Sequence, residues 1–441
     1  MTSTLLGNPV PINEWTVMSD LTPRSELRPR SELRSRNGVP RLAGIARHGR
    51  LRRANPWPTI LKFVAAALAV VLVSSASVGA IAFNSLYSQT DTVQLIGETE
   101  GPPPEIGKID GGFNILIVGS DTRAGQNGIG GDAEDETSSL NDVNILLHVS
   151  QDQTNAVAIS IPRDMVVGIP ECPWDDGSGD VKSYSTEAIN TALYYGGLPC
   201  VVLTVEELTG LDIQFAGMIT FEGVISMADA VGGVPVCVTG PIYDDGIILP
   251  EAGTYTLTGS DALGFLRTRS GVGDGSDLTR ISSQQVYLSS LVRTLQSSDT
   301  LGDFKKVYNL ANAALGNMTL SSSLGNVPTM VSIALALKDI PIERVTFVQY
   351  PGTTGNTDGV YAGKVKPNTA LGDQLMAYVA ADQPFTLDAA GDGRGSELNP
   401  NATPLPTDPS AAPVDTSTLP VLSGVSGQTA ADQTCSIAND Y

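Results

Sequence analysis

Charged side chains stand directly at the ends of three short apolar runs of this sequence. They are Asp121 after the run Ile115–Val118, Asp142 before Val143–Val149, and Arg163 after Ala156–Ile161. In layered α/β folds, functional groups are exposed at the ends of buried strands. A carboxylate or guanidinium beside a buried strand end is costly unless it is paired or binds a ligand. Each position therefore predicts either a structural ion pair or part of a site.

A second group of polar residues follows later in the chain. It comprises Arg267, Arg269, Asp277, Arg280 and Gln284. Arg280 and Gln284 are four residues apart, so they share one face if they lie on a helix. Arg267 and Arg269 are two apart, so they share a face only where the chain is extended.

The two groups together have the composition of an anion site. Arg163 joins the three later arginines and Gln284 as five donors in an otherwise acidic region. The planar guanidinium group matches the oxygens of a phosphate. Two carboxylates, Asp121 and Asp142, supply what Mg²⁺ needs when substrate phosphates provide its other ligands. The pattern predicts a site for a pyrophosphate and Mg²⁺.

Strands and helices alternate around these residues, which predicts an α/β fold: an α-β-α layered domain with a central mixed β-sheet. Short apolar runs predict strands over Asn114–Gly119, Val143–Val149, Ala156–Ile161, Val234–Val238 and Arg344–Tyr350. Helices, several of them stopped by glycine, are predicted over Thr186–Tyr195, Val201–Leu208, Phe221–Val231, Ser260–Arg267, Leu278–Leu295 and Ala370–Val379. Asp277 is the predicted N-cap of the helix that carries Arg280.

The charge changes sign along the chain. Residues 1–62 hold 11 Lys or Arg against 4 Asp or Glu, whereas the remainder holds 15 against 43. Between them, Phe63–Phe83 has no charged residue and is long enough to cross about 30 Å of hydrocarbon as one transmembrane helix. The basic residues before it predict a single-pass protein of the cell membrane with a cytoplasmic N-terminus and an extracytoplasmic domain. A cleaved signal peptide is the alternative, which the long preceding tail disfavours.

Composition divides the chain into five predicted segments. They are a disordered basic cytoplasmic tail (1–62), the transmembrane helix (63–83), a linker (84–112), the folded domain (113–383) and a low-complexity tail (384–441). The low-complexity tail is expected to be disordered except where Cys435 ties it down. For the basic tail, contact with anionic lipid is favoured over nucleic acid, and we expect no nucleic-acid partner. All four cysteines follow the apolar segment and allow two disulfides in three pairings, which the sequence leaves open: Cys172, Cys200, Cys237 and Cys435.

Six strings of this chain resemble, in order and spacing, the LytR-CpsA-Psr (LCP) family of cell-envelope phosphotransferases, in its actinobacterial type. They are NILIVGSDTRAG, LNDVNILLHVS, ISIPRDMVVGIP, INTALYYGG, ADAVGGVPV and ALGFLRTRSGVGDGSDLTRISSQQ. The resemblance covers Phe113 to Thr294 and continues more weakly to Val379. It implies a membrane-anchored enzyme that moves a glycopolymer from a polyprenyl pyrophosphate carrier to peptidoglycan through a phosphodiester bond. The polymer could be arabinogalactan, with teichoic acid, teichuronic acid or capsule left open.

The resemblance also assigns roles residue by residue. It implies that Asp121 and Asp142 bind Mg²⁺ and that Asp277 orients the arginines. The positions that resemble pyrophosphate-binding donors are Arg163, Arg267, Arg269, Arg280 and Gln284. By the same resemblance Asp121 and the four arginines are the expected catalytic residues, and Asp121 is a candidate acceptor of the hydroxyl proton.

The chain departs from the family pattern at a few positions. Leu140 stands where members often carry Arg, and Ser282 and Ser283 where many carry basic residues, so a less positive anion site is expected. A polyprenyl tail needs an apolar channel, which Phe221–Val231 or Tyr287–Leu295 could line, although ordinary core is the simpler interpretation. Two other functions stay open: a pyrophosphatase acting on the lipid pyrophosphate, and a non-catalytic envelope regulator.

Overall fold

The computed structural model describes residues 62, 91–98, 109, 111–122, 139–173, 179–181, 183–297, 304–403, 405 and 415–439. The predicted membrane span Phe63–Phe83, the basic tail before it except Lys62, and most of the predicted linker lie outside these residues. Within the residues described, no helix combines the length and the apolar character needed to cross a bilayer.

An eight-stranded sheet forms the centre of the described fold. Its middle strands β2 (Phe113–Ser120), β3 (Asn141–Val149) and β4 (Ala156–Ile161) are antiparallel neighbours. Parallel pairing adds β9 (Phe215–Ile219) beside β2 and β15 (Val345–Gln349) beside β4. The sheet is therefore mixed, as predicted. Its order is β1-β14-β9-β2-β3-β4-β15-β21, with outer strands β1 (Asp91–Val93), β14 (Met318–Ser321) and β21 (Gly427–Thr429).

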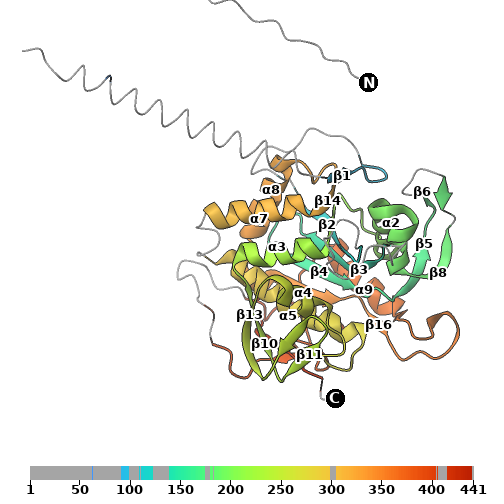
Figure 1. The fold of residues 1–441 in the computed structure, drawn as a ribbon. Helices are drawn as coiled ribbons and strands as arrows, with labels where there is room; N and C mark the ends of the chain where they lie inside the picture. The colour runs from blue at the N-terminus through green and yellow to red at the C-terminus, as the bar shows by residue number, and fades with distance from the viewer. Residues whose placement is uncertain are drawn as a thin grey trace, which may run out of the picture. The chain divides into compact units, whose positions relative to one another are not determined.

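Helices cover both faces of this sheet (Figure 1). One face packs against α2 (Ala192–Thr209) and α9 (Thr369–Ala380). The other face packs against α5 (Asp277–Gln296), α7 (Phe304–Gly316) and α8 (Val327–Lys338). Because β2 and β3 are buried on both sides, their continuous apolar runs are what such strands require.

A second, smaller sheet packs on α5 and on two further helices, α3 (Phe221–Val231) and α4 (Gly259–Arg267). Its order is β13-β10-β22-β19, formed by Gly253–Leu257, Val234–Val238, Thr434–Ser436 and Ser396–Leu398. Short pairs complete the described strands: β5 (Val166–Ile169) with β8 (Tyr184–Ala188), β6 (Cys172–Pro173) with β7 (Asp180–Val181), β11 (Ile242–Asp244) with β12 (Ile247–Leu249), β16 (Gly352–Thr353) with β17 (Lys366–Pro367), and β18 (Thr386–Leu387) with β20 (Val421–Leu422). Three one-turn 3₁₀ helices are η2 (Ile189–Thr191), η3 (Ile342–Arg344) and η4 (Gly359–Tyr361).

The prediction that residues 384–441 form a disordered tail is wrong for the residues described there. Strand β21 is an edge of the central sheet, paired with β15, and β22 and β19 are half of the smaller sheet. Each of these strands is three residues long, so they show no period that a pattern could reveal. The predicted linker 84–112 likewise contains β1, which pairs with β14.

The polar side chains of this C-terminal segment are buried with partners, which explains why composition misled. Gln428 is fully buried and donates its amide to the backbone of Gln285 and the hydroxyl of Ser289. Ser436 bonds Ser283 between their hydroxyl oxygens at 2.6 Å. A buried polar group costs little when its hydrogen bonds are made. Ser283 on α5 therefore faces β22, where a basic side chain would be buried.

The helix predicted over Thr186–Tyr195 begins later than predicted, because residues 186–188 belong to strand β8 and Ile189–Thr191 to η2. Its predicted end is confirmed, because α2 consists of two helical parts separated by non-helical backbone angles at Gly196 and Gly197. Asp277 is not an N-cap, because Ser276 fills that position and accepts from the backbone N–H of Thr279. The carboxylate of Asp277 is thereby free to serve the arginines described below.

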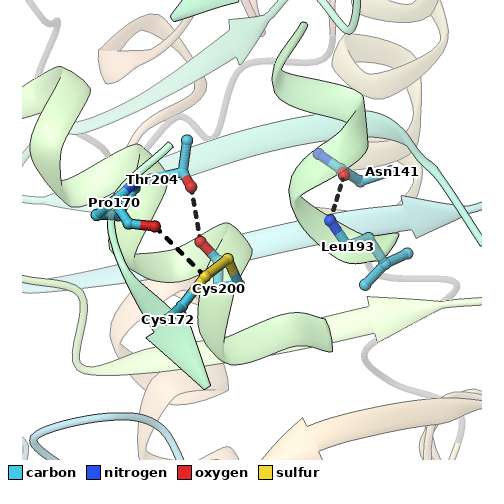
Figure 2. Close-up of a disulfide and its surroundings, with 6 residues drawn as sticks. All are labelled: Asn141, Pro170, Cys172, Leu193, Cys200 and Thr204. Carbon is cyan, nitrogen blue, oxygen red and sulfur yellow. Dashed lines mark hydrogen bonds between the residues drawn. A yellow bond between two sulfur atoms is a disulfide. The ribbon is translucent and has the colours of Figure 1, made fainter. Parts of the chain in front are cut away.

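The cysteines pair as Cys172 with Cys200 and Cys237 with Cys435. The first bridge ties the β6 strand to α2 (Figure 2). The second closes a sequence separation of 198 residues and joins β10 to β22 side by side.

The second bridge predicts a stability effect. Replacing both Cys237 and Cys435 by Ser should lower the free energy of unfolding by about 2–5 kcal/mol, because the unfolded chain regains the entropy of a long loop. Urea unfolding of oxidised protein measures it. The control is the Cys172→Ser/Cys200→Ser pair, whose separation is only 28 residues. An equal or larger loss in that control would contradict the role given to the longer loop.

Candidate active site

Three strand ends meet at one edge of the central sheet. The end of β2 opposes the start of β3, with Ser120 beside Asn141, and the end of β4 lies beside the same stretch, with Ile161 beside Asn144. Antiparallel pairing thus brings the residues that follow β2 and β4 to the position where β3 begins. Asp142 forms an ion pair with Arg163 across this edge.

Asp277, at the first turn of α5, binds several of the predicted donors at once. Its carboxylate lies 2.5 Å from Nη2 of Arg280 and 3.9 Å from Nη2 of Arg269. It also accepts the backbone N–H of Arg163 at 3.1 Å. Because the Asp277 side chain is 4% exposed, its charge acts in a weakly screened environment. Asp277 therefore joins the first turn of α5 to the nearby Arg269 and to Arg163, which lies 114 residues earlier in the sequence.

Arg280 is the most deeply buried cation of the site. Its side chain is 6% exposed, and it donates from Nη2 to the backbone oxygen of Asp142 at 3.1 Å. Burial lowers the pKa of Arg280, and the charge of Asp277 opposes that shift. For Arg163 burial also lowers the pKa, but the charge and hydrogen bond of Asp142, together with the charges of Asp164 and Asp277, outweigh it and the net shift of the pKa is upward. Both guanidinium groups stay charged, because arginine's reference pKa is so high.

Arg267 and Arg269 lie where α4 ends. The helix stops at Arg267, and Thr268 has extended backbone angles (φ −57°, ψ 137°), which is the geometry that the spacing of the two arginines requires. The guanidinium carbon of Arg267 lies 4.3 Å from the centre of the Phe221 ring, a cation–π contact. Asp244 fixes the exit: its carboxylate accepts from the Thr268 hydroxyl at 2.5 Å and from the Arg269 backbone N–H at 3.1 Å.

Asp121 and Gln284 have protein partners. The carboxylate of Asp121 accepts the backbone N–H of Leu140 at 2.7 Å, so it lies against the segment that leads into Asp142. Gln284 is buried and donates its amide to the backbone oxygen of Leu266 at 2.8 Å. Gln284 thus braces the end of α4 in this structure. Its predicted contact with a phosphate stays a prediction.

A cavity of about 1250 Å³, including the solvent space at its mouth, opens from the arginines. At one end it is lined by Asp142, Arg267, Arg280 and Gln284. Its other walls are apolar and come from β2, β3 and helices α3, α4, α5 and α7, with Ile117, Val143, Val224, Met227, Leu291 and Leu310 among the lining residues. The apolar residues of α3 and α5 therefore line this cavity, and several of them, including Ala228, Val231 and Tyr287, also belong to the buried core.

Three guanidinium nitrogens of the arginine cluster are buried without a hydrogen-bond partner among the described residues. They are Nε of Arg163, Nη2 of Arg269 and Nε of Arg280. Of these arginines, Arg280 lines the cavity, whereas Arg163 and Arg269 are not among its lining residues. A buried donor left without a partner costs free energy, whereas donors gathered from separate elements match an anion with many oxygens. The arrangement has the chemistry of a phosphate site at the mouth of an apolar channel.

The donor set fits Mg²⁺ only in part. Asp121 and Asp142 are hard oxygen ligands at neighbouring strand ends, the type that Mg²⁺ prefers. Among the described residues, three or more His, Cys, Asp or Glu side chains do not gather at one point. A Mg²⁺ ion held here would therefore need phosphate oxygens of a substrate to complete its ligands.

The sequence of this chain matches a known protein family. Residues 80–374, more than half of the chain, match the LytR_cpsA_psr family. The chain belongs to the LytR_cpsA_psr family. Within it, the cell wall biosynthesis protein LcpA of Corynebacterium glutamicum is 30% identical over 58% of this chain and 53% of its own length. The polyisoprenyl-teichoic acid–peptidoglycan teichoic acid transferase TagT of Bacillus subtilis is 27% identical over 72% of this chain and 92% of its own length.

Coverage differs among these family members. The chain spans about half the length of LcpA and of the related LcpB from the same organism. Among solved structures, a LytR-Csp2A-Psr enzyme from Actinomyces oris is 19% identical, with a TM-score of 0.49 over 66% of this chain and 96% of that one.

Sequence reasoning missed two residues that position the site in this family member. Asp244 lies in a short hairpin, and nothing in its sequence neighbourhood indicates a partner in another helix. Asn141 donates to the backbone oxygen of Ile189 at 3.1 Å and accepts the N–H of Leu193 at 3.1 Å. A polar residue inside the string LNDVNILL was the one available signal for Asn141.

Asp244 predicts a pH-dependent effect. Burial raises its pKa, but bonds from Thr268 and other donors outweigh this and lower the pKa to about 2. A lowered folded-state pKa gives stability that is present above the unfolded value, about 3.9, and is lost as the pH falls through about 2. Asp244→Asn should therefore destabilise the protein at pH 6 by about 2 kcal/mol and abolish this part of the acid dependence.

Unfolding measured from pH 6 to pH 2 checks this, with Asp245→Asn on the neighbouring exposed position as the control. If the stability of Asp244→Asn depends on acid pH as that of the wild type does, the hydrogen bonds of Asp244 to Thr268 and Arg269 do not contribute as described.

Proposed function

We propose that this protein transfers a wall glycopolymer from a polyprenyl pyrophosphate carrier to peptidoglycan. The observation that supports it most is the continuity of Arg267, Arg280 and Asp142 with the apolar cavity. Such a cavity offers an apolar chain and a pyrophosphate one continuous site. Family membership and the printed activity of TagT, a teichoic acid transferase, point to the same reaction.

The reaction exchanges the phosphoanhydride bond of the pyrophosphate for a phosphodiester bond to peptidoglycan. A hydroxyl oxygen of peptidoglycan attacks the phosphorus that bears the glycopolymer, and the bond from this phosphorus to the bridging oxygen breaks. Polyprenyl phosphate leaves with the electron pair of that bond. The hydroxyl proton passes to a carboxylate of the site, for which Asp121 is the candidate, or to water.

The arginines carry most of the proposed catalysis, because phosphoryl transfer depends on positioning and charge stabilisation. The guanidinium groups of Arg163, Arg269 and Arg280 neutralise the pyrophosphate and the departing phosphate. Asp277 holds the guanidinium groups of Arg269 and Arg280, and Asp142 holds that of Arg163, before substrate arrives, so little reorganisation is needed during reaction. Mg²⁺, if held by Asp121 and Asp142, supplies further charge neutralisation on the phosphate oxygens.

We place the reaction outside the cytoplasm, with Phe63–Phe83 as the anchor beside the carrier. Basic residues before that segment and the acidic remainder support this orientation. The glycopolymer is an arabinogalactan, a teichoic acid or another secondary wall polymer, which the cavity does not distinguish.

A transfer assay tests the proposal directly. Full-length protein, labelled polyprenyl pyrophosphate-linked glycopolymer, Mg²⁺ and peptidoglycan should yield label bound to peptidoglycan. Arg269→Ala should reduce kcat by about 100-fold, the usual effect of removing one charge-stabilising donor. Arg280→Lys keeps the charge but loses the planar guanidinium group, so kcat should fall by a similar amount.

Lys338→Ala on α8 is the matched control, since it removes a half-exposed cation outside the site. Phosphate release with no acceptor-bound label, at any peptidoglycan concentration, would establish the pyrophosphatase instead. Unchanged transfer by Arg269→Ala would remove these arginines from the mechanism.

The channel predicts a dependence on carrier length. Leu291→Phe adds volume to the apolar wall and should raise the KM for a long polyprenyl donor while leaving the KM for a short-chain analogue unchanged. Steady-state kinetics with the two donors measure this. Equal changes in both KM values would show that the carrier does not enter the cavity.

A further inference from the structure

Three tyrosines form an exposed cluster where strand β8 meets helix α2. The rings of Tyr184 and Tyr195 stack with centres 4.8 Å apart and planes 17° apart. The Tyr194 ring lies 5.5 Å from that of Tyr195. Tyr184 and Tyr194 are 37% and 47% exposed. The cluster therefore presents aromatic surface to solvent.

The chain around the cluster is held rigidly. The Cys172–Cys200 bridge ties α2 to the β6 strand just beyond the tyrosines (Figure 2). Gly196 lies so close to this bridge that a Cβ would meet the backbone oxygen of Pro173 at 2.5 Å and Cβ of Cys200 at 2.8 Å. A surface that is already rigid binds at a smaller entropic cost.

Hydrogen bonds connect the cluster to the reacting end of the site. Leu193, next to Tyr194, donates its N–H to Oδ1 of Asn141, the neighbour of Asp142 (Figure 2). Asn190 donates its N–H to the backbone oxygen of Arg163. Standard bond lengths along the first path keep the Cα atoms of Tyr194 and Asp142 within about 16 Å, a distance that a few sugar units span.

The cluster and the apolar cavity belong to opposite faces of the sheet. Successive side chains along a strand point to opposite faces of the sheet. Ile117, Val143 and Ile145 line the cavity, whereas Leu116 and Leu146 pack in the hydrophobic core shared with α2. In-line displacement places the attacking oxygen opposite the leaving oxygen. With the carrier on the cavity face, the acceptor must arrive from the other side, where α2 begins.

We propose that Tyr184, Tyr194 and Tyr195 bind the sugar rings of the acceptor glycan strand, which rests on the proposed transfer to peptidoglycan. Sugar rings present C–H faces that pack on aromatic faces, and tyrosine adds a hydroxyl for their polar edges at low conformational cost. The formal net charge of −21 disfavours a phosphate-rich polymer away from the arginines. The acceptor, rather than the phosphorylated donor, is therefore the occupant.

Direct binding tests the cluster without any transfer step. The full chain should bind chitotetraose, a neutral N-acetylhexosamine tetrasaccharide, as followed by NMR or calorimetry. Tyr194→Ala should weaken this binding about tenfold, as expected for loss of one stacked ring, and Tyr194→Phe should restore most of it. The control is Tyr243→Ala, an exposed tyrosine on the β11–β12 hairpin, which should bind as the wild type.

The transfer assay then separates acceptor from donor. Tyr194→Ala should raise the KM for peptidoglycan about tenfold, with the KM for the lipid-linked donor unchanged. Chitotetraose binding that is equal in Tyr194→Ala and wild type overturns the proposal, even where the wild type transfers polymer normally. A rise in the donor KM instead overturns the acceptor assignment. If Tyr194→Ala loses chitotetraose binding but the wild type transfers no polymer, the glycan site is supported and the proposed function is not.

Discussion

The carboxylate of Asp277 is the interaction on which the rest of the site depends. It pairs with Arg280 and Arg269 and accepts the backbone of Arg163. Like charges at this spacing repel, most strongly where burial excludes water, so the arginines could not gather without it. The charge of Asp277 is shared between Arg280 and Arg269, whereas the guanidinium group of Arg163 has its own partner in Asp142. At Arg269 and Arg280 the cluster is therefore incompletely neutralised, which leaves positive charge for an anionic ligand.

The pleat of β2 and β3 decides what lies on each side of that cluster. Successive side chains point to opposite faces, so one set faces the apolar cavity while the next set packs beneath α2. A long apolar ligand and a polar polymer can then reach the same strand ends without sharing a surface. The sheet separates the surfaces for the two ligands, and both surfaces end at the strand ends that carry the site.

Many of the strands, helices and site residues could be predicted from the sequence, because they produce local sequence patterns. The apolar runs of β2, β3 and β4 and helix α3 were predicted within a residue or two at each end. The gathering of Asp142, Arg163, Asp277 and Arg280 was predicted, although their roles stay predictions. Asp244 and the C-terminal strands were missed because their partners lie far away in the sequence, and no local period records a single hydrogen bond or a two-residue strand.

The position of β21 and β22 in the sheets has a consequence for how the protein forms. Synthesis proceeds from the N-terminus, yet the edge next to β15 and the strand next to β10 come from residues 427–436. These pairings close over large sequence separations and therefore form late. Until those residues have emerged, β15 has an open edge, which invites pairing with other chains. The folded state is completed, and its sheet protected, by residues that are synthesised well after the strands with which they pair.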